Sequence, residues 1–467
     1  MTGITVLPAV ELLAMLRRKQ ISPLELAEEY IRQIERLNPQ LLALVDFDQE
    51  RVREQARALQ DSGVARGPLF GLPMSMKGSI ATAGYRCELG SLLHRGHIPR
   101  ENATVVDRAL QAGAVILGTT NCPEFLMAYE TDNRLYGRTA NPWDTDRTAG
   151  GSSGGESAAV AAGLSAAGLG SDSGGSVRTP AHFTGICSLK PTPGRIPGRG
   201  HLAAGDGPFS ILGAVGPMAR TIRDVTLLFI TLAGQDVRDP VSPPVGLRNE
   251  SLEDLKRVPI GFFEEDGPVT EETRQAVRDA ARALEEQGFQ VRAFKPQALE
   301  EARQLWWKFF VRGGAMLLDP LVKTRRAELS PTFLDFLSIA HREPPLSAEE
   351  LLSAWMDLDH VRRKLLAEME SFPILLCPVC AIPAFRHGER RWDVDGHSLK
   401  YLEAMRYTQW FNLLGAPAAV VPVGRSPEGL PIGVQIAGRP FDDERVLGIA
   451  AAVEAAFGYE PPPLTGT

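Results

Sequence analysis

Hydrophobic residues recur at helical spacing near the start of the chain. Four of them lie three or four positions apart and form one face of a helix: Leu26, Tyr30, Ile34 and Leu37. The segment Ser22-Pro23-Leu24-Glu25 just before them is a capping box with proline at the first helical position. The pattern predicts an amphipathic helix that runs to about Asn38, and a second helix over 48–60.

From Gly67 onward, short apolar runs alternate with helical segments. Strands are predicted at 72–76, 114–117, 165–170, 260–263, 372–376 and 418–423. Helices are predicted at 104–111, 158–162, from about 176, and over 270–287. This alternation favours an α/β fold with a largely parallel or mixed sheet. Residues 235–258 are rich in proline, asparagine and charge, so we expect them at the surface.

Composition narrows the class of protein. Fifty basic and 57 acidic residues in 467 give a net charge of -7, which argues against a nucleic-acid or anionic-membrane partner. The five cysteines make a disulfide scaffold improbable. No apolar run reaches the roughly 18 residues that a bilayer span needs. The first 20 residues carry charges and lack the apolar core of a secretory signal, so we expect a cytoplasmic protein.

Two glycine-serine clusters, Gly150–Gly155 and Gly174–Ser176, flank a helix-like run of alanines. Glycine lets backbone N–H groups approach a ligand and point at one spot. Serine becomes a nucleophile when a base removes its proton. The clusters therefore indicate an acyl-transfer site. A flexible linker would also be rich in glycine and serine, but the Asn141-Pro142-Trp143 turn and the alanine run argue for ordered flanks.

Two enzyme motifs nearly match the first cluster. Residues 150–157 fit a phosphate-binding loop, except that Glu156 stands where lysine is required and would repel phosphate. Gly151, Ser153 and Gly155 fit the G-x-S-x-G nucleophile elbow, which requires a hydrophobic strand immediately before it. Residues 144–147 are polar instead, so the elbow stays an alternative.

Lys77 closes the apolar segment 72–77. Its position alone favours a surface lysine that extends its ammonium group into water. A desolvated lysine would have a pKa below the reference value of about 10.4 and could act as a general base for a serine. Both interpretations are open at this point.

Together these segments resemble the amidase signature family. Its hallmark clusters stand here as Gly150-Gly151-Ser152-Ser153-Gly154-Gly155 and as Asp172-Ser173-Gly174-Gly175-Ser176-Val177-Arg178-Thr179-Pro180-Ala181. The resemblance extends to residues 72–77, 141–143, 189–192 and 429–435, so it covers nearly the whole chain. Glu156 and the segments 120–122, 133–138 and 184–187 are closest to fatty acid amide hydrolases, although the N-terminal membrane helix of the animal enzymes is absent.

The resemblance implies a Ser–Ser–Lys triad without metal or cofactor. Ser176 would be the nucleophile, Ser152 the bridging serine after a cis peptide bond, and Lys77 the base. Backbone N–H groups would receive the oxyanion, from Ser173, Gly174, Gly175 and Ser176. The two triad serines are 24 positions apart (176 minus 152), which leaves room for one helix and one returning strand.

Other residues have a structural and a functional interpretation. Asp172 and Arg178 are interpreted as a pair that braces the loop, or as an exposed pair in water. Leu126 and Met127 match positions near the substrate in fatty acid amide hydrolases. The aromatic cluster at 306–310 is either core or the wall of an acyl pocket.

Two further motifs are interpreted as core. We expect His182 to be a buried core histidine. Cys377 and Cys380 have zinc or redox spacing, but no second cysteine pair completes a site, so we expect two buried strand cysteines.

The sequence thus predicts one large domain over 1–467, with a central mixed sheet covered by helices on both faces. Its predicted parts are N-terminal helices (1–65), a catalytic core (66–235), a variable pocket region (236–365) and the rest of the sheet (366–467). The expected activity is hydrolysis of a carboxylic amide with an apolar acyl or aryl group. A glutaminase of the amidotransferase type, which works with partner chains, and an inactive binding module are the alternatives, and a homodimer stays open.

Overall fold

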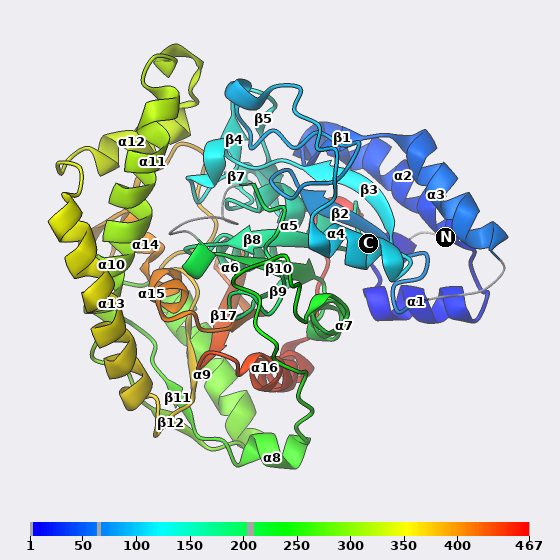
Figure 1. Cartoon of the computed structure of the whole chain (residues 1–467). Helices are drawn as coiled ribbons and strands as arrows, with labels where there is room; N and C mark the ends of the chain where they lie inside the picture. Colours follow the sequence, from blue (N-terminus) through cyan, green and yellow to red (C-terminus); the bar gives the residue numbers. More distant parts are fainter. Residues whose placement is uncertain (1–2, 63–66, 203–209, 467) are drawn as a thin grey trace.

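The computed structural model describes residues 3–62, 67–202 and 210–466, and eleven strands of this part form one sheet (Figure 1). Their order is β1-β3-β2-β8-β10-β9-β16-β17-β13-β11-β12. The strands are β1 (Leu44–Phe47), β2 (Pro73–Lys77), β3 (Val115–Thr120), β8 (Ala167–Asp172), β9 (Cys187–Lys190), β10 (Ala214–Ala219), β11 (Ile260–Phe262), β12 (Val291–Ala293), β13 (Ile374–Pro378), β16 (Ala418–Arg425) and β17 (Pro431–Gly438).

The sheet is mixed, as the sequence predicts. Strands β3, β2 and β8 are parallel on one side, and β13, β11 and β12 are parallel on the other. The strands between these two groups pair antiparallel. The order also interleaves distant parts of the chain, because β16 from the C-terminal part lies directly beside β9.

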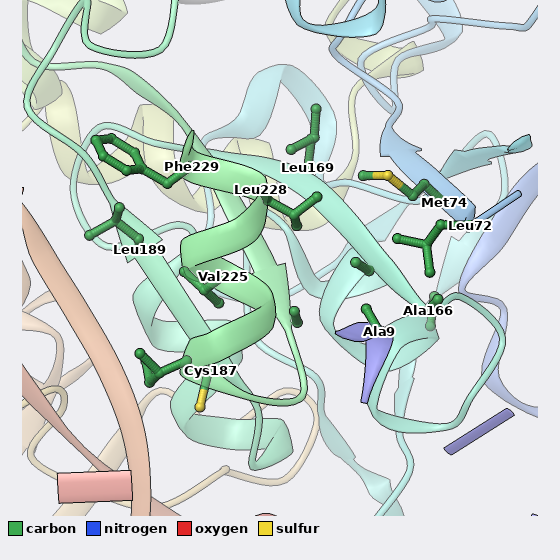
Figure 2. Close-up of a cluster of buried hydrophobic side chains, with 14 of the residues drawn as sticks. Ala9, Leu72, Met74, Ala166, Leu169, Cys187, Leu189, Val225, Leu228 and Phe229 are labelled. Atoms are coloured by element: carbon green, nitrogen blue, oxygen red, sulfur yellow. The ribbon is translucent and has the colours of Figure 1, made fainter. Parts of the chain in front are cut away.

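Helices cover both faces of the sheet. Their bounds are α1 (Ala9–Arg17), α2 (Pro23–Leu41), α3 (Gln49–Asp61), α4 (Thr104–Gln111), α5 (Gly154–Ala161), α6 (Arg178–Thr184), α7 (Ile222–Leu232), α8 (Leu252–Lys256), α9 (Glu271–Glu286) and α16 (Asp443–Phe457). Helices α5 and α6 pack together on one face, and α7, α9 and α16 on the other. Figure 2 shows Val225, Leu228 and Phe229 of α7 among apolar side chains of the sheet.

The remaining helices and strands lie beside the sheet. The helices are α10 (Leu299–Trp306), the π-helix η5 (Trp307–Arg312), α11 (Gly313–Val322), α12 (Pro331–Ala340), α13 (Ala348–Glu368), α14 (Tyr401–Ala404) and α15 (Arg406–Leu414). Short 3₁₀ turns are η1 (Ile4–Val6), η2 (Leu92–His94), η3 (Glu124–Leu126), η6 (Arg326–Glu328) and η7 (Pro463–Thr465). Three two-stranded sheets pair β4 (Asp132–Asn133) with β5 (Gly137–Arg138), β6 (Ala140–Asn141) with β7 (Asp144–Thr148), and β14 (Arg391–Val394) with β15 (His397–Lys400).

Most predicted elements are found within a few residues of their expected bounds. The capping box at Ser22 forms, with Glu25 N–H donating to the serine oxygen over 3.2 Å. The polar residues 144–147 belong to a short strand, β7, which pairs with β6 and bridges from Arg147 to Arg386 outside the central sheet, so it is not the hydrophobic strand that a nucleophile elbow requires. No helix in the described ranges has the length and apolarity to cross a bilayer.

Candidate active site

Lys77 is buried at the carboxyl end of β2. Its side chain has no exposed surface, so the interpretation as a surface lysine is wrong. The strand lies between β3 and β8 in the interior of the sheet, and all five of its residues are buried. The ammonium nitrogen donates to Ser152 Oγ over 2.7 Å and to Ser171 Oγ over 2.9 Å. Burial lowers the pKa of Lys77 to about 8, although Cys122, Asp172 and Glu156 oppose the shift.

The first glycine-serine cluster forms a tight loop between β7 and α5. The Gly151–Ser152 peptide bond is cis. A Cβ at Gly151 would lie 2.6 Å from the carbonyl oxygen of Ala128, so only glycine fits this close approach. Ser152 is almost fully buried, and its hydroxyl accepts the hydrogen bond from Lys77.

Ser153 does not have the exposed hydroxyl of a nucleophile elbow. It has no exposed surface, and its Oγ lies 3.3 Å from both the backbone nitrogen and the carbonyl oxygen of Ser171. Its own N–H donates to the carbonyl oxygen of Ser176 over 3.1 Å. The residue therefore joins the two clusters, and the elbow interpretation is wrong.

Ser176 lies in the loop between β8 and α6, where it lines a cavity. Its exposed fraction is 9%, compared with 1% for Ser152 and 0% for Lys77. Among the described residues, no side chain accepts or donates a hydrogen bond at its hydroxyl, and none joins it to Ser152. Of the three predicted triad residues, Ser176 is thus the one that a ligand in the cavity can contact.

Asp172 and Arg178 form a fully buried ion pair, so the interpretation as an exposed pair is wrong. Arg178 donates to both carboxylate oxygens over 3.0 Å. Asn412 of α15 adds a hydrogen bond of 2.9 Å to the same carboxylate. Burial alone would raise the pKa of Asp172, but Arg178 holds that pKa well below its usual range.

The Asp172 carboxylate also fixes the backbone of the nucleophile loop, residues 173–176. It accepts the N–H groups of Gly175 over 2.8 Å and of Val177 over 3.1 Å. The expectation that the Gly175 N–H receives an oxyanion therefore disagrees with this geometry. Within the described ranges, the amides of Ser173, Gly174 and Ser176 donate to no protein acceptor.

Three side chains hold the carbonyl groups of the nucleophile loop. Tyr129 OH and Thr408 Oγ1 donate to the carbonyl oxygen of Gly174 over 2.7 and 2.6 Å. The indole N–H of Trp306 donates to the carbonyl oxygen of Ser173 over 2.8 Å. Because the Ser173 carbonyl shares a peptide plane with the Gly174 N–H, the Trp306 bond fixes the direction of that free amide before any ligand arrives.

The cavity at Ser176 is apolar. Its lining consists of Leu126, Met127, Ala128, Tyr129, Gly174, Ser176, Trp306, Phe310, Val311, Phe336 and Leu402. None of these lining residues carries a charge. The cavity volume is about 20 Å³, which is space for about one water molecule.

The aromatic cluster at 306–310 divides between cavity and core. Trp306 and Phe310 line the cavity and stack with ring centroids 4.8 Å apart. Phe309 is buried and packs edge-on against Trp355, while the Trp307 indole donates to Glu343 over 3.2 Å. Both interpretations of the cluster thus apply, each to different residues.

His182, Cys377 and Cys380 lie in the core, as the sequence predicts, although only Cys377 is in a strand, β13, and Cys380 lies two residues past the end of that strand. His182 is fully buried between the backbone of Gly433 and the carbonyl oxygen of Ile382, and burial lowers its pKa to about 4. Both cysteines are buried free thiols. The described residues contain no cluster of His, Cys, Asp and Glu that could hold a metal ion.

Sequence reasoning missed four residues that shape the site: Ser171, Tyr129, Thr408 and Asn412. Ser171 directly precedes Asp172 at the end of a predicted strand, so its position was a usable signal. Thr408 and Asn412 are one helical turn apart on α15 and belong to no local motif.

Comparison with known proteins decides the family. The family model described as Amidase matches residues 25–447. The chain belongs to the amidase family. It is therefore an enzyme of a family that hydrolyses amide C–N bonds, and the family resemblance inferred from the sequence is confirmed.

The relatives of this amidase have more than one role. The A-subunit of the glutamyl-tRNA(Gln) amidotransferase from Synechococcus sp. (strain JA-2-3B'a(2-13)) is 34% identical over 96% of this chain and 91% of its own length. An acylamidase of Rhodococcus erythropolis is 35% identical over 96% of this chain and 95% of its own. The solved structure of a bacterial aryl acylamidase is 28% identical, with a TM-score of 0.84 over 96% of each chain.

Proposed function

We propose that this amidase hydrolyses a neutral carboxylic amide with an apolar acyl or aryl group, through a Ser176–Ser152–Lys77 triad and an acyl-enzyme. One observation carries the proposal. A fully buried lysine donates a 2.7 Å hydrogen bond to Ser152, and Ser176, whose carbonyl oxygen accepts the N–H of Ser153, the residue that follows Ser152, borders an apolar cavity. Burial is the condition that gives a lysine the neutral form it needs to accept a proton.

The reaction follows from these positions. Neutral Lys77 takes the proton of Ser152, and Ser152 takes that of Ser176 as the Ser176 oxygen attacks the amide carbonyl carbon. A contact between the two serines that is absent in the free enzyme has to form with substrate bound, as catalytic hydrogen bonds often do. The reversed relay protonates the departing amine, and water then cleaves the ester to release the acid.

The amides of Gly174 and Ser176 are the proposed oxyanion donors, with Ser173 beside them. A preorganised N–H donor of this kind contributes about 3 kcal/mol to transition-state stabilisation. The carbonyl oxygen of Gly174 is already held by Tyr129 and Thr408. Little reorganisation is therefore needed when charge develops on the substrate oxygen.

The lining of the cavity supports the choice of substrate. Apolar and aromatic side chains surround the space beside Ser176, and none of the lining residues is charged. Such a lining favours burial of a hydrocarbon or an aromatic ring, for which the lining side chains have to move apart because the free space holds only about one water molecule. The acylamidase from Rhodococcus erythropolis, 35% identical to this chain, supports the same substrate class.

The test is Ser176→Ala with a panel of anilides and alkyl amides of increasing acyl length. We expect a loss of at least about a thousandfold in kcat/KM, because the nucleophile is gone, with an unchanged melting temperature. Ser338→Ala, at an exposed serine of α12, is the matched control and should leave activity intact. Amide hydrolysis that survives in Ser176→Ala would refute the triad.

A fluorophosphonate probe separates the enzyme from an inactive binding module. The probe should label the wild type at Ser176 and leave Ser176→Ala unlabelled. No labelling of the wild type would favour the binding module.

The role of an amidotransferase glutaminase is the second candidate, because a chain of that kind is 34% identical over 96% of this one. It predicts hydrolysis of glutamine and copurification of partner chains. The uncharged cavity lining offers no partner for the charged groups of glutamine. Glutamine should therefore be a poor substrate, and glutamine turnover that exceeds anilide turnover would favour the amidotransferase role.

We also propose a cytoplasmic location. All five cysteines are free and buried, which suits a reducing compartment. Fractionation of cells that express the full chain tests this location.

A further inference from the structure

Trp306 makes two contacts at the active site that the mechanism above does not use. It ends α10, and its side chain is almost fully buried. Its ring forms part of the cavity wall, while its indole N–H donates to the carbonyl oxygen of Ser173 over 2.8 Å. One side chain thus contacts both the acyl cavity and the nucleophile loop.

The hydrogen bond to Ser173 has a consequence for the neighbouring amide. The Ser173 carbonyl and the Gly174 N–H belong to one planar peptide unit, so a fixed carbonyl direction also fixes the N–H direction. On the other side of Gly174, its carbonyl oxygen accepts hydrogen bonds from Tyr129 and Thr408. The Gly174 amide, one of the proposed oxyanion donors, is thereby held from both sides.

The ring of Trp306 also lies close to this loop. A Cβ at Gly174 would be 2.5 Å from Cζ2 of the indole, so the ring leaves no room for a side chain there. The indole also stacks on Phe310, with ring planes 13° apart. Phe310 belongs to the π-helix η5, which begins directly after Trp306. Single π-helical turns within helices often mark functional sites.

We propose that Trp306 is a positioning residue that orients the Gly174 amide from the wall of the acyl cavity. The inference rests on the proposed function, because it assigns the oxyanion to that amide. In this arrangement the residue that contacts the acyl group also sets the rate of the chemical step. Phe310, in contrast, lines the cavity and stacks on the indole, but its hydrocarbon ring has no N–H to donate to the loop, so we expect its main effect on substrate binding.

The test compares Trp306→Phe with Phe310→Leu. Trp306→Phe keeps an aromatic ring and removes the N–H donor, so we expect roughly a tenfold loss of kcat, the effect of one hydrogen bond. Phe310→Leu changes the cavity but no hydrogen bond to the loop, and it should alter KM with kcat retained. Trp307→Phe, whose indole donates to Glu343 and not to the loop, is the control and should leave both constants unchanged.

A second readout separates positioning from packing. A trifluoromethyl ketone forms a tetrahedral adduct with the nucleophile and places an anionic oxygen at the oxyanion donors. Its inhibition constant should rise roughly tenfold in Trp306→Phe, whereas that of the carboxylic acid product should not change. Benzothienylalanine at position 306 keeps the bicyclic shape without the N–H, and it should reproduce the loss even if Trp306→Phe folds poorly.

Two outcomes would overturn the inference. One is a benzothienylalanine variant with wild-type kcat, and the other is an equal change in the two inhibition constants. Failure of the proposed function looks different, because Ser176→Ala would then retain activity and the wild type would resist the trifluoromethyl ketone. If Ser176 is essential but the N–H of Trp306 is not, the inference about Trp306 alone is wrong.

Discussion

Burial and nearby acidic groups have opposite effects on the pKa of Lys77. Burial lowers the pKa of the lysine to about 8, and Cys122, Asp172 and Glu156 act in the opposite direction. The pKa of the Cys122 thiol is raised to about 12 by burial, and Asp172 is ionised throughout the neutral range. Burial raises the pKa of Glu156 to about 7, so of these three groups only Glu156 changes charge near neutral pH.

The first prediction concerns the pH dependence of kcat/KM. The base has to be neutral, so kcat/KM should rise as the pH increases through about 8 and level off above it. Ionised Glu156 raises the pKa of Lys77 by charge attraction. Glu156→Gln removes that charge and should move the rising limb to lower pH, whereas Glu286→Gln, at an exposed position of α9, should not move it. A limb that stays in place or moves to higher pH would contradict this electrostatic coupling.

The triad candidates could be proposed from the sequence because the two glycine-serine clusters and the segment that ends at Lys77 resemble the motifs of the amidase signature family. The environment of Lys77 could not, since a lysine at the end of an apolar run is equally consistent with exposure to water. Only the packing of β2 between β3 and β8 removes its contact with solvent.

At the scale of single elements, α5 packs against β2 and β8 through small residues. Glu156 of α5 accepts hydrogen bonds from Ser75 of β2 and, over 2.9 Å, from Thr120 of β3. A Cβ at Gly168 of β8 would lie 1.7 Å from Oε1 of Glu156. Because Gly168 has no side chain, the Glu156 carboxyl group can lie against the sheet and accept hydrogen bonds from Ser75 and Thr120.

The second prediction follows from this contact. Gly168→Ala should lower the free energy of unfolding by about 1–3 kcal/mol, because the new methyl group displaces Glu156 from its hydrogen bonds. Gly246→Ala, where nothing lies within 4 Å, should change it by less than about 0.5 kcal/mol. Urea unfolding of both variants gives the comparison. Equal stability of the two would mean that α5 moves freely away from the sheet.

Element types were predictable where periodicity is strong and poorly predictable where residues are small. The capping box and apolar stripe of α2 indicated its start and its buried face correctly. Strand β10 was missed because Gly216 and Pro217 are typical of a turn. The structure explains the glycine, since a Cβ at Gly216 would lie 2.3 Å from the carbonyl oxygen of Leu189 in the neighbouring strand.

At the scale of the whole molecule, the sheet joins early and late parts of the chain. Strands β16 and β17 lie between β9 and β13, so they connect the two parallel groups of strands. Helix α15 supplies Thr408 and Asn412 to the nucleophile loop. This long-range pairing has no local sequence signal, and for that reason the proposed boundaries at 235 and 365 remain predictions.

The third prediction concerns a chain that ends at residue 365. It lacks β13, β16 and β17, which leaves β9 and β11 as unpaired strand edges, so we expect it to aggregate. Circular dichroism and size-exclusion chromatography against the full chain test this. A soluble, cooperatively unfolding product would show that the first 365 residues fold independently.

The support of the nucleophile loop by Trp306, Thr408 and Asn412 has a consequence during protein synthesis. A ribosome-bound chain of about 300 residues already contains the lysine and both serines but none of these three supports. We therefore expect catalysis to begin only after the last quarter of the polypeptide has left the ribosome and packed against the nucleophile loop. An unfinished or prematurely terminated molecule would contain the lysine and both serines but would not hydrolyse amides in the cell.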